Sequence, residues 1–109
     1  MAVNPADSPV FGTLYGSDAM RAIWDERQML QHMLDVEAAL ARVQARLGII
    51  PAEAATAITA AARVENLEID ELAASVRNVG YPVVGVVKGL SRAAGALSLI
   101  HISEPTRPY

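Results

Sequence analysis

The chain has 109 residues, of which 52% are hydrophobic, with a formal net charge of −3 and no cysteine. This length allows one domain with a modest core, and the composition excludes disulfides and thiol chemistry and gives no reason to expect nucleic-acid binding. Because no window approaches the roughly 20 uninterrupted apolar residues that cross a bilayer, and the first residues lack the basic and apolar regions of a signal peptide, we expect a cytoplasmic protein without a membrane segment.

Residues 1–13 are rich in proline, aspartate, serine and glycine, which is typical of a flexible or draped arm. A long helical pattern follows, and Ser17 or Asp18 is expected to cap it, because either side chain accepts a hydrogen bond from a free N–H of the first turn. Gly48 is a natural stop, so the pattern predicts one helix of roughly thirty residues, a length that favours a helical bundle. Its apolar side is formed at helical spacing by Met20, Ile23, Trp24, Leu30, Met33, Leu34, Leu40, Ala41 and Leu47.

Two shorter helices are expected next. The second helix covers residues 52–63, with Ile58 as its only large apolar side chain. The third covers residues 70–77, with Asp70 as its cap. Its inward side is predicted to consist of Ile69, Leu72, Ala73 and Val76. Since no stretch shows a convincing strand alternation, the predicted fold class is all-α.

A glycine and a proline flank one aromatic residue at Gly80, Tyr81 and Pro82. Proline suits the first turn of a helix, so a fourth helix is expected from Pro82 towards Gly95. Proline also disfavours the α region for the residue before it, so Tyr81 should be extended. The free N–H groups at a helix start, with the positive end of the helix dipole, suit a carboxylate or phosphate. The sequence therefore predicts anion binding at this corner, with a plain helix–helix turn as the alternative.

The other polar residues indicate structure rather than chemistry. Helical spacing places Glu37 among apolar residues, so its carboxylate needs a partner, which Arg21 or an arginine of another chain could supply. Lys88 and His32 are interpreted as surface residues. No metal site and no histidine-based catalytic pair can be assembled, so we assign no catalytic residue, metal or cofactor. Three methionines are interpreted as core filler: Met20, Met29 and Met33.

Residues 97–109 break the pattern of everything before them. The alanine-rich helical composition stops, and the new segment has neither a cap nor an amphipathic face. Back-translated, residues 97–107 match the transposase adapter used in short-read library preparation codon for codon. We therefore expect an arm over residues 1–13, a helical N-terminal domain fragment over 14–96, and a non-native adapter-derived tail over 97–109. On this interpretation the native gene continues past residue 96.

Three blocks in the helical part carry a family resemblance. Residues 14–24 are similar to the opening block of the fumarase/aspartase superfamily, in the branch of the 3-carboxy-cis,cis-muconate cycloisomerases and adenylosuccinate lyases. Residues 33–41, followed by 47–51, resemble the first long helix and turn of that branch. The Gly-Tyr-Pro-Val-Val sequence with Val87 and Lys88 resembles the Gly-x-Pro corner of the cycloisomerases. The order and spacing of the blocks make this resemblance fairly specific.

The resemblance implies a homotetramer built on a long helical bundle, with active sites assembled from several subunits around a small carboxylate substrate. The substrate-binding positions that it implies are Tyr15, Gly80, Tyr81 and Pro82, and the alternative for Tyr15 is a half-buried aromatic that packs the arm against the long helix. Leu14 replaces an arginine that is usual in the lyases, and Tyr81 stands where the lyases carry a histidine. Both departures favour the cycloisomerases.

We therefore expect an N-terminal fragment of a 3-carboxy-cis,cis-muconate cycloisomerase-like enzyme, which adds a carboxylate across a double bond to form a lactone in aromatic catabolism. The histidine-containing block and mobile serine loop of the family lie beyond residue 96, so the fragment should be inactive alone. The alternatives are a fragment of an adenylosuccinate lyase or related lyase, and a small helical interaction module whose long amphipathic helix binds a partner. Neither nucleic acid nor membrane is expected as a partner.

Overall fold

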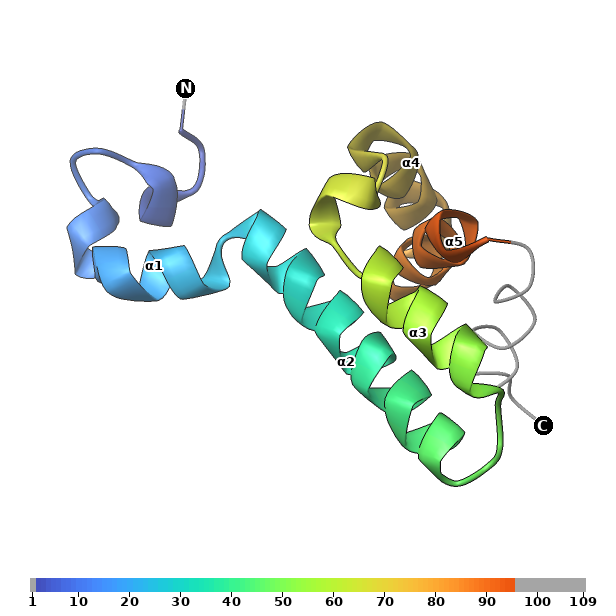
Figure 1. The fold of residues 1–109 in the computed structure, drawn as a ribbon. Helices are drawn as coiled ribbons and strands as arrows, with labels where there is room; N and C mark the ends of the chain where they lie inside the picture. Colours follow the sequence, from blue (N-terminus) through green and yellow to red (C-terminus); the bar gives the residue numbers. More distant parts are fainter. Residues whose placement is uncertain (1, 96–109) are drawn as a thin grey trace.

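The computed structural model describes residues 2–95, and the predicted tail lies outside them. Within this range the chain forms helices and turns and no strand, so the predicted all-α fold is confirmed (Figure 1). No helix in it combines the length and apolar content needed to cross a membrane. The elements are the short 3-10 helices η1 (Pro5–Asp7), η2 (Gly12–Leu14) and η3 (Val64–Asn66), and the α-helices α1 (Asp18–Trp24), α2 (Glu26–Arg46), α3 (Ala52–Ala61), α4 (Ile69–Val79) and α5 (Val83–Ala94).

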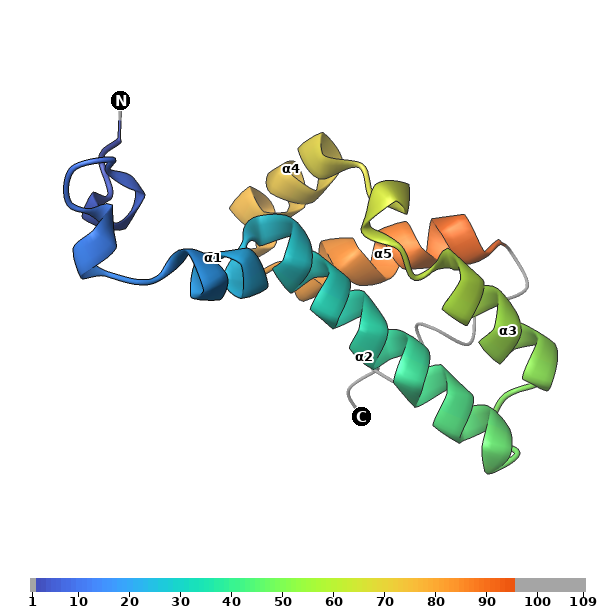
Figure 2. The same cartoon turned by 60° about the vertical axis from the view of Figure 1, so that its left-hand side comes forward.

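The helices form a compact body with a projecting N-terminal end. α2 and α3 lie side by side as an antiparallel pair, and α5 packs against α2, α3 and α4. The arm and α1 extend away from this body, as Figures 1 and 2 show from two directions. η1 and η2 contact each other, so the predicted arm contains two defined turns. Its flexibility stays a prediction.

The core lies where α2, α3 and α5 meet. Its largest fully buried side chains are Leu34, Ile58, Val86 and Leu90. Alanines fill much of the remaining contact between α2 and α3, and their small side chains let the two backbones approach closely. The buried alanines of these two helices are Ala38, Ala41, Ala54, Ala55 and Ala61.

The prediction of a single long helix is wrong, because the helix is interrupted at Asp25. This residue is extended (φ −64°, ψ 156°), and its carboxylate accepts a hydrogen bond from the N–H of Arg27 at 3.1 Å. Asp25 is therefore the N-cap of α2, whereas Ser17 caps α1 as predicted, accepting from the N–H of Met20 at 3.2 Å. A sequence signal was present: an aspartate three residues before Gln28 has the spacing of a capping box.

Replacing Asp25 tests the importance of this cap. We expect Asp25→Ala to lower the free energy of unfolding by about 1 kcal/mol, because a free N–H at the start of α2 loses its partner. Urea unfolding followed by circular dichroism measures the change. Asp25→Ser is the matched control, since serine also caps helices, and it should stay close to wild type. Equal stability of Asp25→Ala and wild type would contradict a capping role.

Other helix boundaries also differ from prediction, and α4 ends at Val79 rather than Arg77. α3 ends at Ala61 rather than Arg63, and the side-chain amide of Asn66 donates to the Ala61 carbonyl at 3.0 Å. Asn66 thus satisfies one of the carbonyls left free at the helix end. Glu68 rather than Asp70 occupies the N-cap position of α4, and it makes no side-chain capping bond. Asp70 lies inside the first turn, where its negative charge still favours the helix dipole.

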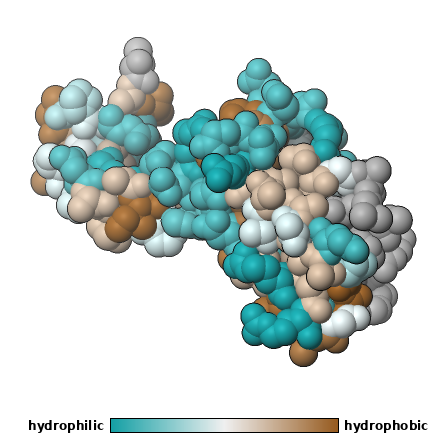
Figure 3. All heavy atoms as spheres, in the orientation of Figure 1, coloured by the Kyte–Doolittle hydropathy of each residue, from teal (hydrophilic) through white to brown (hydrophobic). Residues whose placement is uncertain are grey.

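Some apolar residues that were predicted to face the core are exposed. α1 projects from the body, and Figure 3 shows hydrophobic surface on this end of the molecule. On α4 only Leu72 of the four predicted inward residues is buried. The core-filler prediction holds for Met33, which packs against the core, and is wrong for the other two methionines. The large apolar residues that are exposed against prediction are Met20, Ile23, Trp24, Met29, Leu40, Leu47 and Ile69.

Candidate functional site

The predicted corner between α4 and α5 is formed by Gly80, Tyr81 and Pro82. Gly80 adopts the left-handed conformation (φ 96°), and its N–H donates to the Val76 carbonyl at 2.8 Å, which closes α4. Glycine suits this position because a Cβ would strain a backbone with positive φ. Pro82 is the N-cap of α5, so the prediction of a helix directly after it is confirmed. The Tyr81 side chain between them is 55% exposed.

The start of α5 has the features that an anion site requires. No side chain caps this helix, and its first turn holds no acidic residue. The first N–H groups of a helix have no partner within it, and the helix dipole is positive at this end. Tyr81, one residue before the cap, is exposed and carries a hydroxyl that could add a further donor. Anion binding here stays a prediction.

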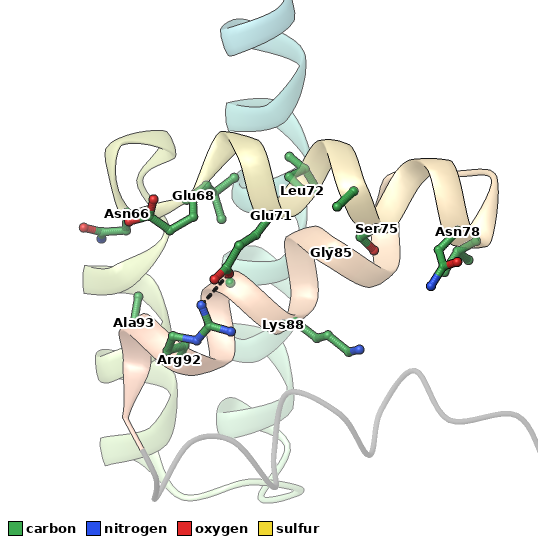
Figure 4. A pocket seen from close by; sticks show the side chains of 14 residues that line it. Asn66, Glu68, Glu71, Leu72, Ser75, Asn78, Gly85, Lys88, Arg92 and Ala93 are labelled. Atoms are coloured by element: carbon green, nitrogen blue, oxygen red, sulfur yellow. Dashed lines mark hydrogen bonds and ion pairs between the residues drawn. The ribbon is translucent and has the colours of Figure 1, made fainter.

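A groove of about 740 Å³ lies between α4 and α5, and Gly80, Tyr81 and Pro82 are not among the residues that line it (Figure 4). Asn78 lies at the end next to the corner, and Lys88 lines the same groove from α5, exposed as predicted. Glu71 and Arg92 bridge the groove with an ion pair of 2.6 Å, in which both side chains are exposed. The hydrogen bond and charge of Glu71 raise the pKa of the Arg92 guanidinium.

Two glycines of α5 let this helix pack closely against α4 and the residues just before it. A Cβ at Gly85 would lie 2.5 Å from Leu72 Cδ1, and a Cβ at Gly89 would lie 2.6 Å from Leu67 Cδ2. Residues four apart share one helix face. The Gly-x-x-x-Gly spacing is therefore the sequence signal for this close approach, which was not predicted.

The structure does not bring all the predicted site residues together. Gly80, Tyr81 and Pro82 are adjacent in the corner, whereas Tyr15 follows η2 in the arm and is 63% exposed. Figures 1 and 2 place the arm beyond α1, away from α4 and α5. Among residues 2–95, no three histidines or acidic residues are grouped so that they could hold a metal ion.

The predicted pairing of Glu37 with Arg21 is wrong. Arg21 instead donates hydrogen bonds to two backbone carbonyls of the arm, those of Ala6 and Gly12. Glu37 is half-buried and makes no hydrogen bond or ion pair within the part of the chain that the structure describes. Desolvation by burial raises the pKa of its carboxyl group. An arginine of another chain as its partner stays a prediction.

The raised pKa of Glu37 predicts a pH-dependent stability. The pKa of Glu37 is higher in the folded than in the unfolded state. Its contribution to the free energy of unfolding is therefore fully present below the ordinary carboxyl range, and it is lost as the pH rises through the folded-state pKa. Glu37→Gln should therefore be more stable than wild type at neutral pH, and the difference should vanish below about pH 4. Thermal unfolding across this range measures it, with the exposed Glu65→Gln as control. Parallel curves for Glu37→Gln and wild type would contradict the prediction.

Comparisons with known proteins agree with this architecture, although no family model matches the chain. It is 41% identical over 95 residues to an adenylosuccinate lyase of Pyrococcus horikoshii, covering 87% of this chain and 20% of that protein. It is 41% identical over 96 residues to a 3-carboxy-cis,cis-muconate cycloisomerase of Pseudomonas aeruginosa, covering 88% of this chain and 21% of that protein. The crystal structure of a fumarate lyase from Mesorhizobium sp. BNC1 matches with a TM-score of 0.69 and 43% identity, over 75% of this chain and 19% of that chain.

The shared helical fold and sequence define the class of protein, an all-helical segment common to lyases and cycloisomerases. The chain belongs to the fumarase/aspartase superfamily, in the branch that holds the adenylosuccinate lyases and the 3-carboxy-cis,cis-muconate cycloisomerases. It spans about a fifth of the length of the curated relatives that it matches. The resemblance predicted from the three sequence blocks is confirmed, and the equal identities favour neither enzyme.

Proposed function

We propose that the chain is the N-terminal part of a 3-carboxy-cis,cis-muconate cycloisomerase-like enzyme. The observation that carries this proposal is the corner at Gly80, Tyr81 and Pro82, which presents an exposed tyrosine at an uncapped helix start without acidic residues. Tyr81 replaces the histidine that the resemblance implies for adenylosuccinate lyases. Leu14, in place of the arginine of those lyases, supports the same choice.

The proposed reaction joins an internal carboxylate to a double bond. One carboxylate oxygen bonds to an alkene carbon, the neighbouring carbon takes a proton, and a lactone ring results. Charge on a second carboxylate of the substrate must be held by preorganised donors. In our proposal the N–H groups of α5 and the Tyr81 hydroxyl hold that carboxylate, and Tyr15 contacts it from a neighbouring subunit of a homotetramer. The group that transfers the proton is proposed to lie beyond residue 96.

The test replaces residues 97–109, which we predict to be derived from an adapter, by the sequence that the native gene encodes after codon 96. We expect the extended protein to form the lactone from 3-carboxy-cis,cis-muconate and to leave adenylosuccinate uncleaved, and we expect the 109-residue chain to do neither. Cleavage of adenylosuccinate would instead establish the lyase alternative. A native stop codon directly after codon 96 would overturn both enzyme proposals and favour a helical interaction module.

Tyr81→Phe tests the corner in the extended enzyme. Removing the hydroxyl should raise KM roughly tenfold, which corresponds to one hydrogen bond to a charged group. Val79→Ala is the matched control, since Val79 is exposed beside the corner and carries no polar atom. An unchanged KM for Tyr81→Phe would show that the tyrosine does not contact the substrate.

A further inference from the structure

The side chain of Arg21 connects the arm to α1 by hydrogen bonds. Arg21 lies in the last turn of α1, and its guanidinium donates from Nη1 to the Ala6 carbonyl at 2.6 Å and from Nη2 to the Gly12 carbonyl. Ala6 belongs to η1, and Gly12 begins η2. The two turns of the arm are therefore held at a single point by one planar group. Hydrogen bonds from an ionised donor are stronger than those between neutral groups.

The backbone of Tyr15 is hydrogen-bonded to the same Gly12 carbonyl. Its backbone N–H donates to the Gly12 carbonyl at 3.0 Å, so this oxygen accepts from both Tyr15 and Arg21. A carbonyl oxygen has two lone pairs and can accept both bonds. Gly12 is buried, and a Cβ there would lie 3.1 Å from the Ala6 oxygen and 3.3 Å from Arg21 Nη2. A side chain at Gly12 would therefore press on the junction.

We infer that Arg21 is a positioning residue for Tyr15: it holds the arm in the two turns that present the tyrosine beside α1. Within residues 2–95 the ion pair is between Glu71 and Arg92, and Arg21 pairs with no carboxylate there. The guanidinium of Arg21 instead donates to the two arm carbonyls. A lysine lacks the rigid fork that reaches two carbonyls at once. The substrate part of this inference rests on the proposed function of Tyr15, whereas the anchoring of the arm does not.

Hydrogen exchange measured by mass spectrometry on the 109-residue chain tests the anchoring. In Arg21→Ala the amides of Gly12 and Tyr15 should exchange about tenfold faster or more, because the bonds that hold both turns are lost. In Arg21→Lys these amides should exchange at a rate between those of wild type and Arg21→Ala. Arg27→Ala is the matched control, since no side-chain bond of Arg27 occurs in the described residues, and it should exchange like wild type. Equal exchange in Arg21→Ala and wild type would overturn the inference.

A second variant covers the case in which Arg21→Ala unfolds α1. Gly12→Ala does not alter the sequence of α1, and its added Cβ lies close to the Ala6 oxygen and Arg21 Nη2. It should therefore also speed the exchange of the Tyr15 amide. Unchanged exchange in Gly12→Ala, in a protein whose circular dichroism matches wild type, would contradict the anchoring.

Kinetics of the enzyme extended with its native sequence separate anchoring from function. We expect Arg21→Ala to raise KM about tenfold with kcat within about twofold, since a misplaced arm weakens one substrate contact. Combining it with Tyr15→Phe should cost little more than the larger single change, because both act through Tyr15. Faster exchange with an unchanged KM would overturn the substrate role of Tyr15 and leave the proposed reaction standing.

Discussion

Leu34→Ala is expected to lower the free energy of unfolding by about 2–5 kcal/mol, the range measured for removing large buried aliphatic side chains. Leu34 has no exposed surface and lies on α2, where that helix faces the core. The loss combines the hydrophobic transfer of the removed atoms with the cavity that they leave. A domain of this size has little stability to spare, so the variant should be partly unfolded at 37 °C, which is a physiological temperature for many organisms.

Urea unfolding followed by circular dichroism measures this change. Leu47→Ala is the matched control, because it removes the same atoms from a side chain that is 69% exposed at the end of α2. Its effect should stay within about 0.5 kcal/mol. Equal effects of the two substitutions would mean that the helices do not pack around Leu34 as described.

Gly85→Val is expected to destabilise the chain by about 1–3 kcal/mol through overpacking between α4 and α5. A Cβ at this position would lie 2.5 Å from Leu72 Cδ1 and 3.2 Å from Ser75 Oγ. Leu72 is buried, so its side chain has little room to move. The β-branched valine adds two further carbons to the same contact, and the helices must separate to accommodate them.

The matched control is Gly16→Val, where nothing lies within 4 Å of the added Cβ. It should change stability by no more than about 0.5 kcal/mol. Gly85→Ala should be milder than Gly85→Val, because alanine favours helix and adds one carbon only. A stability of Gly85→Val equal to or above that of wild type would contradict the close packing of α4 on α5.

Local signals in the sequence predicted most of the helices. Ser17 as a cap, Gly48 after α2 (φ 76°) and the corner at Gly80 and Pro82 all depend on residues close in the chain, and the structure confirms them. The break at Asp25 also had a local signal, which the continuous apolar pattern on both sides obscured. Family membership likewise followed from short blocks in order, and the comparisons confirm it.

The direction of each apolar face was less predictable. Helical spacing shows which side of a helix is apolar, but not whether another element covers that side. Met20, Ile23 and Trp24 form such a side on α1, and it is exposed because α1 projects from the body. On α4, Ile69 lines an apolar groove of about 390 Å³ between α4 and α2, so no other element within residues 2–95 covers it.

The sequence by itself determined the all-α class, the helix end before Gly48, the corner before α5 and the family. The helices, the helix end and the corner depend on backbone conformations and hydrogen bonds that residues near one another in the chain decide. Only the tertiary structure decided the partner of Arg21 and the lack of one for Glu37 within the described residues. The physical reason is that a charged side chain takes whichever acceptor the packing brings to it, and helical spacing does not determine how the arm folds back over α1.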